Sequence, residues 1–234
     1  MADGAKATRP QRTAIPPPKR PSNREAGMKR RAALAAVAAL AGCSVLPQQP
    51  YLQRRDWPLL VRRPQALPPR RNGPVLLLRT LTAGPGLAVR GLQRLLPDGS
   101  LQVDFYEQWA VPPAEGLEAS LRQWLADSGL FAAVTQPGSR LAADYVLEGE
   151  LTAFVADPPK KVARAGLSVI LLDQTPGGDK LGLQQTESAQ APLASADAPA
   201  VVQAMQAALA VVLEMTEADV ADILARSATK GRRA

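Results

Sequence analysis

Short apolar or alternating runs recur between residues 75 and 192, and this pattern predicts a β-sheet. Alternate side chains of a strand face opposite sides of a sheet, so 75–81, 101–105, 131–134, 144–151, 162–172 and 181–189 are expected strands. In 144–151, Tyr145, Leu147, Gly149 and Leu151 should share one face. The stretch 97–100 predicts a hairpin turn after apolar residues 87–96, because proline presets φ and glycine accepts positive φ.

Two stretches have the three-to-four-residue spacing of an amphipathic helix. The first follows Pro113 and ends near Gly129, with acidic residues in its first turn. Its apolar stripe consists of Leu117, Leu121, Trp124 and Leu125. The second starts at Asp197, an expected N-cap with a proline in the first turn. Its stripe consists of Val202, Met205, Leu209, Val212 and Leu213, continued by Val220, Ile223 and Leu224.

The order of these elements predicts an α+β fold, with a mainly antiparallel β-sheet and two amphipathic helices packed on one face. The domain is expected to span residues 75–225. Before it, 43–74 is rich in proline and carries three arginine pairs, which is typical of an extended tether. Those arginines either keep the tether solvated or contact anionic lipid headgroups. Residues 226–234 are expected to form a basic, frayed tail.

Residues 28–42 have the three parts of a secretory signal peptide. A basic stretch at 29–31 precedes an apolar run at 32–40, and small residues follow. The run is far shorter than the roughly 20 residues that cross a bilayer, so a retained transmembrane helix is not expected. Residues 1–27 are interpreted as a mis-assigned N-terminal extension, with an unusually long basic region of the signal as the alternative.

The sequence Leu40-Ala41-Gly42-Cys43 resembles the lipobox of bacterial lipoproteins at every position. The resemblance implies that signal peptidase recognises Leu40, Ala41 and Gly42 and cleaves before Cys43. It also implies a diacylglyceryl group on the Cys43 thiol and a further acyl chain, such as palmitate, on the new amino terminus. Several chains matter because one acyl chain attaches a protein only marginally. The competing interpretation, a buried core thiol, would not explain the neighbouring signal.

Ser44 follows the lipidated cysteine, where an aspartate favours inner-membrane retention in enteric bacteria. Its presence implies lipid anchoring at the periplasmic face of the outer membrane, with the inner membrane as the alternative.

The formal charge of +7 arises entirely from the residues upstream of Cys43. Residues 1–42 hold nine basic and two acidic residues, whereas 43–234 hold nineteen of each. The expected domain, 75–225, has nine basic and eighteen acidic residues. Nucleic-acid binding is therefore not expected, because it depends on basic surfaces that contact phosphates.

The chain contains no histidine and a single cysteine, which excludes several kinds of site. Ser-His-Asp and Cys-His catalysis, histidine or multi-cysteine zinc sites and an internal disulfide all need residues it lacks. Apart from the lipid on Cys43 no cofactor or metal is expected, and the absence of a Walker A loop excludes an ATPase.

An enzyme remains a less favoured alternative. Asp144, Glu148 and Glu150 alternate along one strand, but this also describes the solvated side of a half-buried strand. Ser139 beside Arg140 has no histidine to activate it. No catalytic residue is therefore assigned.

Several short motifs behind the lipobox resemble one family. They are Phe105-Tyr106, Trp109-Ala110-Val111-Pro112, Gly129-Leu130-Phe131 with Val134, Ala143-Asp144-Tyr145-Val146-Leu147 with Phe154, and the final amphipathic helix. In this order they are similar to the auxiliary lipoproteins of ABC-type transport systems, which include the paraquat-inducible lipoprotein. Such lipoproteins are encoded beside mammalian-cell-entry (MCE) proteins. The long tether departs from that pattern.

The resemblance implies a non-enzymatic component that docks onto an MCE-type partner and assists lipid movement between membranes, with phospholipid as a further ligand. The runner-up is a lipoprotein that chaperones or plugs an outer-membrane protein. A homo-oligomer, the lipid cargo, the direction of transport and the docking surface all stay open at this point.

Overall fold

The computed structural model describes residues 52–176 and 181–231. The expected signal, the lipobox and Ser44 lie outside these ranges. The described part contains nine strands and two α-helices, together with a short 3-10 helix, η1 (Pro158–Lys160). The strands are β1 (Arg55–Trp57), β2 (Val75–Leu78), β3 (Thr82–Ala83), β4 (Gly91–Leu95), β5 (Leu101–Trp109), β6 (Ala133–Thr135), β7 (Tyr145–Asp157), β8 (Val162–Asp173) and β9 (Leu181–Pro192).

Strand β7 organises the sheet. One of its edges pairs with β8 in an antiparallel ladder, and β8 pairs in the same sense with β9. The other edge pairs in turn with β2, β3 and β4, all of them parallel to β7. Strand β2 also carries β6, whereas β4 carries β5 and through it β1. The predicted hairpin is confirmed, because β4 and β5 pair antiparallel across the turn at 97–100.

The domain has an α+β fold, as predicted. Its sheet, however, is mixed rather than mainly antiparallel. Five of its pairings are parallel: β1 with β5, β2 with β6, and β7 with each of β2, β3 and β4. The prediction assumed hairpins between successive strands. Instead a long connection containing a helix separates β2 and β3 from β7, and such a crossover returns the chain in the same direction.

The helices are α2 (Pro113–Ala126) and α3 (Ala198–Gly231). Every residue of both predicted apolar stripes is buried. Asp197 caps α3 as expected, because its Oδ1 accepts a hydrogen bond from the backbone N–H of Ala200 at 2.9 Å. The helix continues to Gly231, so residues 226–231 are helical rather than a frayed tail.

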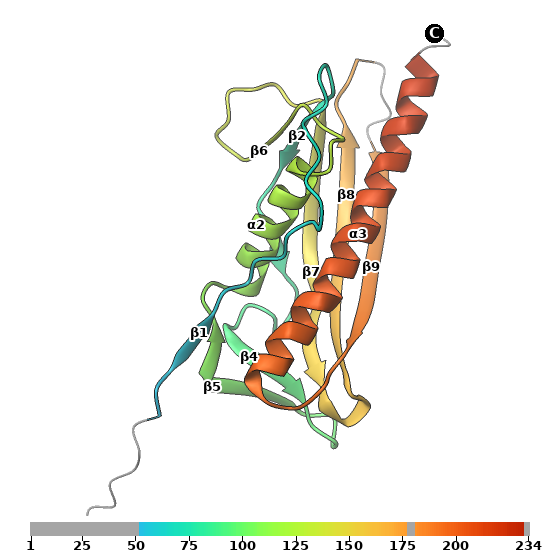
Figure 1. Ribbon diagram of the computed structural model, residues 1–234. Coiled ribbons are helices and arrows are strands. Elements are labelled where there is room, and N and C mark those ends of the chain that lie inside the picture. Colours follow the sequence, from blue (N-terminus) through green and yellow to red (C-terminus); the bar gives the residue numbers. More distant parts are fainter. Residues whose placement is uncertain (1–51, 177–180, 232–234) are drawn as a thin grey trace, which may run out of the picture. The chain divides into compact units, whose positions relative to one another are not determined.

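One hydrophobic core joins the two helices to the sheet. Figure 1 shows α3 running along β8 and β9, with α2 beside it. Leu147 and Leu151 of β7 and Leu167 and Leu171 of β8 lie in this core, in register with the predicted alternation. By length and composition alone α3 could cross a membrane. Half of its apolar window is buried against the domain, as expected for a core helix.

The segment 58–74, here called the strap, is bound along the domain instead of forming a free tether. Leu59 and Val61 belong to the hydrophobic core. Leu59 lies so close to Gly116 of α2 that a Cβ there would come within 2.8 Å of it. The backbone N–H of Val61 donates to Ser120 Oγ at 3.0 Å. The first turns of α2 are thus shaped to receive the strap.

Farther along, polar contacts hold the strap to both helices. Glu217 of α3 accepts hydrogen bonds from Arg63 Nε at 3.0 Å and from Trp124 Nε1 at 2.7 Å. The backbone N–H of Leu67 donates to the carbonyl of Asp127 at 2.8 Å. The packed domain therefore begins near β1, about twenty residues before the predicted boundary at 75.

Candidate functional site

A pocket of about 720 Å³ lies where the β4–β5 hairpin, η1 and the start of α3 meet. We call it the β5 pocket. Its apolar lining consists of Leu95, Leu96, Pro97, Pro158, Pro159, Ala196, Ala198 and Pro199. Its polar lining consists of Arg55, Arg94, Gln102, Asp104, Glu107 and Asp197. The prolines at 97, 158, 159 and 199 occur in turns and at helix starts, where a fixed φ is tolerated.

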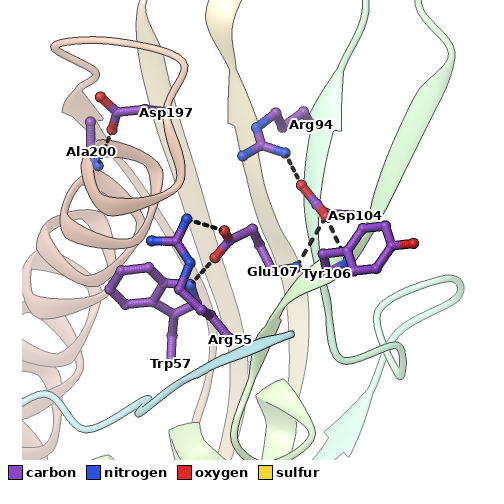
Figure 2. Close-up of polar contacts among 8 residues, drawn as sticks. All are labelled: Arg55, Trp57, Arg94, Asp104, Tyr106, Glu107, Asp197 and Ala200. Carbon is purple, nitrogen blue, oxygen red and sulfur yellow. Dashed lines mark hydrogen bonds and ion pairs between the residues drawn. The ribbon is translucent and has the colours of Figure 1, made fainter. Parts of the chain in front are cut away.

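Strand β5 bulges beside this pocket, and Asp104 holds the bulge in shape. Between the pairs Gly91–Gln108 and Gln93–Val103, β5 contains several more residues than β4. Asp104 Oδ1 accepts hydrogen bonds from the backbone N–H groups of Tyr106, at 3.0 Å, and Glu107, at 3.1 Å. Its Oδ2 accepts one from Arg94 Nη1 at 3.0 Å (Figure 2). The bulge is therefore a built feature rather than a local irregularity.

Gly91 allows the bulge to approach β4. A Cβ at this position would lie 2.2 Å from the carbonyl oxygen of Asp104. Only glycine fits at such a distance, since two backbones come together there.

The charge of Asp104 depends on this network. Burial acts to raise the pKa of its carboxyl. The hydrogen bond from Arg94 and those from the backbone N–H groups of Glu107 and Tyr106 outweigh burial, so the pKa lies below its ordinary value. The carboxylate is thus ionised at neutral pH. Arg94 is only 11% exposed, and its Nε is buried without a hydrogen-bond partner among the described residues.

Strand β1 is attached to the same bulge through Glu107. Arg55 Nη2 lies 2.8 Å from Glu107 Oε1, and Trp57 Nε1 donates to Oε2 at 2.7 Å (Figure 2). The parallel register places Arg55 opposite Glu107. One carboxylate therefore holds both the charged and the aromatic side chain of β1.

Asp197 stands at the pocket's opposite wall, at the start of α3. Its Oδ1 accepts from the backbone N–H of Ala200, and its Oδ2 accepts from Ser195 Oγ at 2.9 Å. These hydrogen bonds, with a smaller contribution from the charge of Arg94, place the pKa of Asp197 below its ordinary value. The carboxylate thus neutralises the positive end of α3 on this side of the pocket.

This geometry is suited to binding. The polar groups mainly contact one another, and most of the remaining wall is apolar. Within residues 52–176 and 181–231 no cluster of metal-ligating side chains occurs.

Of the carboxylates considered for catalysis, Glu148 and Glu150 line a second pocket of about 370 Å³ together with Arg79, whereas Asp144 does not. Asp144 Oδ2 accepts a hydrogen bond from the backbone N–H of Val75 at 2.8 Å, joining β2 to the start of β7. Glu148 pairs with Arg79 at 2.8 Å, and Glu150 is exposed on β7. None of the three lines the β5 pocket.

The remaining predicted residues fall elsewhere. Ser139 lies in an exposed loop, where its Oγ accepts from the backbone N–H of Leu141 at 3.2 Å. Cys43, Leu40, Ala41, Gly42 and Ser44 lie outside the described residues, so their roles stay predictions.

The pocket and bulge were not predicted from the sequence. Asp104 occupied a polar position in an alternating run and could not be told from a solvated residue. Its partner Arg94 lies on the neighbouring strand. The one available signal was the pair of adjacent aromatics, Phe105 and Tyr106, which breaks the alternation directly after Asp104.

Together these features define an α+β domain with an apolar pocket at the end where the chain enters. The family model described as the ABC-type transport auxiliary lipoprotein component matches residues 59–215. The chain therefore belongs to this family of transport auxiliary lipoproteins. No curated protein matches the chain.

Two solved structures show the same fold. Protein XCC0632 from Xanthomonas campestris, of the family DUF330, is 23% identical and has a TM-score of 0.62. The match covers 75% of this chain and 99% of that one. A second crystal structure, of an uncharacterised protein, is 15% identical with a TM-score of 0.56, covering 73% and 97% of the two chains. At these identities the likeness concerns the fold alone.

Proposed function

We propose that this protein is a lipid-anchored periplasmic component of an ABC-type intermembrane lipid transport system and acts by docking onto an MCE-type partner. The observation that carries the proposal is the family match over residues 59–215, behind a complete lipobox. The family is one of transport auxiliary components rather than a known enzyme family. Phospholipid is the proposed cargo of the whole system.

The anchor in this proposal is Cys43, acylated after cleavage by signal peptidase. Ser44 supports the periplasmic face of the outer membrane as the location. The folded domain begins at β1, about twelve residues after this cysteine. The anchor would therefore hold the domain close to the membrane while its other surfaces reach the partner.

The free edge of β9 is the surface that best supports partner docking. Among the described strands β9 pairs only with β8, so its other edge exposes backbone donors and acceptors along twelve residues. Gln184, Thr186 and Gln190 are exposed on this strand. An added strand from a partner could continue the sheet there, with backbone hydrogen bonds supplying much of the affinity.

The test is co-purification from membranes of the native host, using the tagged full-length chain and mass spectrometry of what it retains. We expect an MCE-type protein to be enriched with the wild type. The double variant Gln184→Lys/Gln190→Lys should lose that partner, since lysines on an edge strand oppose further strand pairing.

Thr152→Lys/Leu141→Lys is the matched control, because it adds the same charge at exposed positions away from β9. It should retain the partner. Co-purification of a β-barrel protein in place of an MCE-type protein would instead support the chaperone alternative. Loss of the partner in both variants would contradict docking through β9.

A further inference from the structure

Strand β5 carries an exposed apolar patch, formed by Leu101 and Val103 before the bulge and by Phe105 and Tyr106 within it. Their exposed fractions are 46%, 46%, 68% and 42%. Four of the fourteen large exposed hydrophobic side chains in the described residues thus fall within six positions of one strand. Single exposed apolar residues are ordinary, but such a concentration indicates a contact surface.

The patch is held outward by rigid contacts. Hydrogen bonds from Tyr106 and Glu107 to Asp104 fix the backbone on either side of the bulge. The rings of Phe105 and Tyr106 pack edge to face, with centroids 5.2 Å apart. Gln102 and Asp104, between the patch residues along the strand, line the β5 pocket instead. Over residues 101–105 the alternation therefore directs Gln102 and Asp104 to the pocket and the apolar side chains away from it.

The backbone edge beside the patch is unpaired as well. Strand β1 pairs only with Glu107–Trp109 of β5, so residues 101–106 have no partner on that side among the described strands. Arg54, the residue before β1, places its guanidinium 5.2 Å from the centre of the Phe105 ring. The chain that leads back to Cys43 thus leaves the domain directly at the patch.

Chain length then limits how far the patch can be from the membrane. Eleven residue steps separate Cys43 from Arg54. At about 3.3–3.6 Å per residue, even a fully extended chain spans less than about 40 Å. Helix α3, by contrast, is 34 residues long, or about 50 Å at 1.5 Å per residue, and it leads to the other end of the domain (Figure 1).

We propose that the patch lies on the phospholipid bilayer to which Cys43 is anchored, with Phe105 and Tyr106 at the headgroup level. This inference rests on the proposed lipid anchor. Aromatic side chains favour the interface between headgroups and acyl chains, and aliphatic tips add buried apolar area there. Arg54, stacked on Phe105, can extend its guanidinium to lipid phosphates.

The charged residues around the patch favour contact with a membrane surface that has no strong net charge. Arg94 neutralises Asp104, and Arg55 neutralises Glu107. Asp98, at the tip of the β4–β5 hairpin, accepts hydrogen bonds from Ser100, which place its pKa below the ordinary value. It is therefore negative at neutral pH and would oppose an anionic surface. Zwitterionic phospholipid is accordingly the ligand assigned.

Because Cys43 is the only cysteine of the chain, a second cysteine introduced by substitution can carry a fluorophore that reports contact of the patch with the bilayer. An acylated Cys43 cannot react with a thiol reagent, so Leu101→Cys and Tyr106→Cys each place one environment-sensitive fluorophore on the patch. Gln184→Cys, exposed on β9 toward the far end of the domain, is the matched control. The full-length acylated chains are reconstituted into phosphatidylcholine vesicles with or without doxyl-labelled acyl chains.

We expect blue-shifted emission at positions 101 and 106, quenched by the doxyl lipid, and solvent-like, unquenched emission at 184. Adding Phe105→Ser to Leu101→Cys should reduce the quenching, because the largest inserting side chain is lost. Solvent-like emission at both patch positions would overturn the proposal. A blue shift without doxyl quenching would also overturn it, because that result assigns the patch to a protein partner or a second copy.

Failure of the anchor gives a different result. If the wild-type chain itself takes up the fluorophore, Cys43 carries a free thiol and the proposed lipidation is wrong. The patch is then tested with the same variants in a Cys43→Ser background. Doxyl quenching of those chains would support the patch independently of the anchor, and its absence would overturn both.

Discussion

The two ends of the domain are stabilised by different means. At the end where the chain enters, ion pairs and hydrogen bonds among Arg55, Arg94, Asp104 and Glu107 shape a bulge and leave apolar side chains exposed. Along α3 and the strands it covers, apolar side chains of both layers are buried in the hydrophobic core. In the first region the polar network holds an apolar surface exposed, whereas the second region is the packed core that supports it.

Because of this difference, substitutions that affect stability and substitutions that affect binding should fall in different regions of the domain. Substitutions in the α3 core should unfold the domain, whereas those in the β5 patch should alter contacts and leave the fold in place. Core residues buried from water contribute several kcal/mol each, but exposed ones contribute little. The following predictions test that separation, from the largest expected effect to the smallest.

Leu209→Ala should have the largest effect. Leu209 is fully buried in α3, and removing its branched end leaves a cavity in the core. We expect the free energy of unfolding to fall by about 2–5 kcal/mol, measured by urea denaturation with circular dichroism. Val211→Ala, at an exposed position of the same helix, is the control and should change little. Equal losses of unfolding free energy in the two variants would contradict the assignment of Leu209 to the core and Val211 to the surface.

Asp104→Asn should have the next largest effect and act at the other end. The variant keeps the shape of the side chain but loses the charge that pairs with the nearly buried Arg94. A hydrogen bond to a charged group contributes about 1.5–3 kcal/mol, so urea denaturation should show a loss of that order. Asp98→Asn, in the exposed turn, is the control. An unchanged stability would show that the bulge forms without its carboxylate.

Glu217→Gln tests the attachment of the strap. Glu217 accepts hydrogen bonds from both Arg63 and Trp124; Trp124 is buried, whereas Arg63 and Glu217 are partly exposed. We expect a loss of about 1 kcal/mol, together with faster proteolysis within residues 58–74. Glu214→Gln, one turn away and exposed, should leave both measurements unchanged. Unaltered proteolysis of the Glu217 variant would mean that Leu59 and Val61 alone hold the strap.

The smallest effect is expected for Asp219→Asn, and its sign is opposite. Burial and the neighbouring Glu187 carboxyl, with a smaller contribution from Asp222, raise the pKa of Asp219 above the ordinary 3.8. As the pH rises through 3.8, the unfolded chain ionises this group first, so the folded state loses stability. The asparagine variant should therefore be more stable than wild type at neutral pH and gain nothing below pH 3.8.

Asp104 should respond to pH in the opposite direction. Its folded-state pKa is lowered, so its contribution is present above the ordinary aspartate pKa and is lost as the pH falls through the lowered value. Urea midpoints of Asp104→Asn and Asp219→Asn, followed against pH, should diverge from wild type in opposite senses. Parallel curves would contradict these two assignments.

Local patterns predicted most elements but not their arrangement. The alternation around Leu147 and the stripe around Leu209 are periodic over many residues, so the longer strands and both helices could be recognised, whereas the short strands β1 and β3 were not predicted. Parallel pairing of β2, β3 and β4 with β7 could not, because it depends on how the chain returns after α2. Pairing of this kind joins residues about seventy positions apart, such as Leu77 and Val146.

The strap and the bulge were missed for a related reason. Leu59 and Val61 lie among prolines and arginines without a regular period, so their burial depends on the surface that α2 offers. Asp104 is recognisable only through Arg94 and the backbone groups that it binds. In both places the information is in tertiary contacts, which composition and spacing do not contain.

The proposed lipid anchor on Cys43 is tested most directly by the intact mass of the mature protein. The chain would be expressed with its own signal in a native-host background, and its membranes fractionated beside those of a Cys43→Ala variant. We predict a mature species that begins at acylated Cys43 and fractionates with the outer membrane, and loss of that species in the variant. A full-length, unmodified and soluble product would contradict the account, and the basic residues before Cys43 would then need another function.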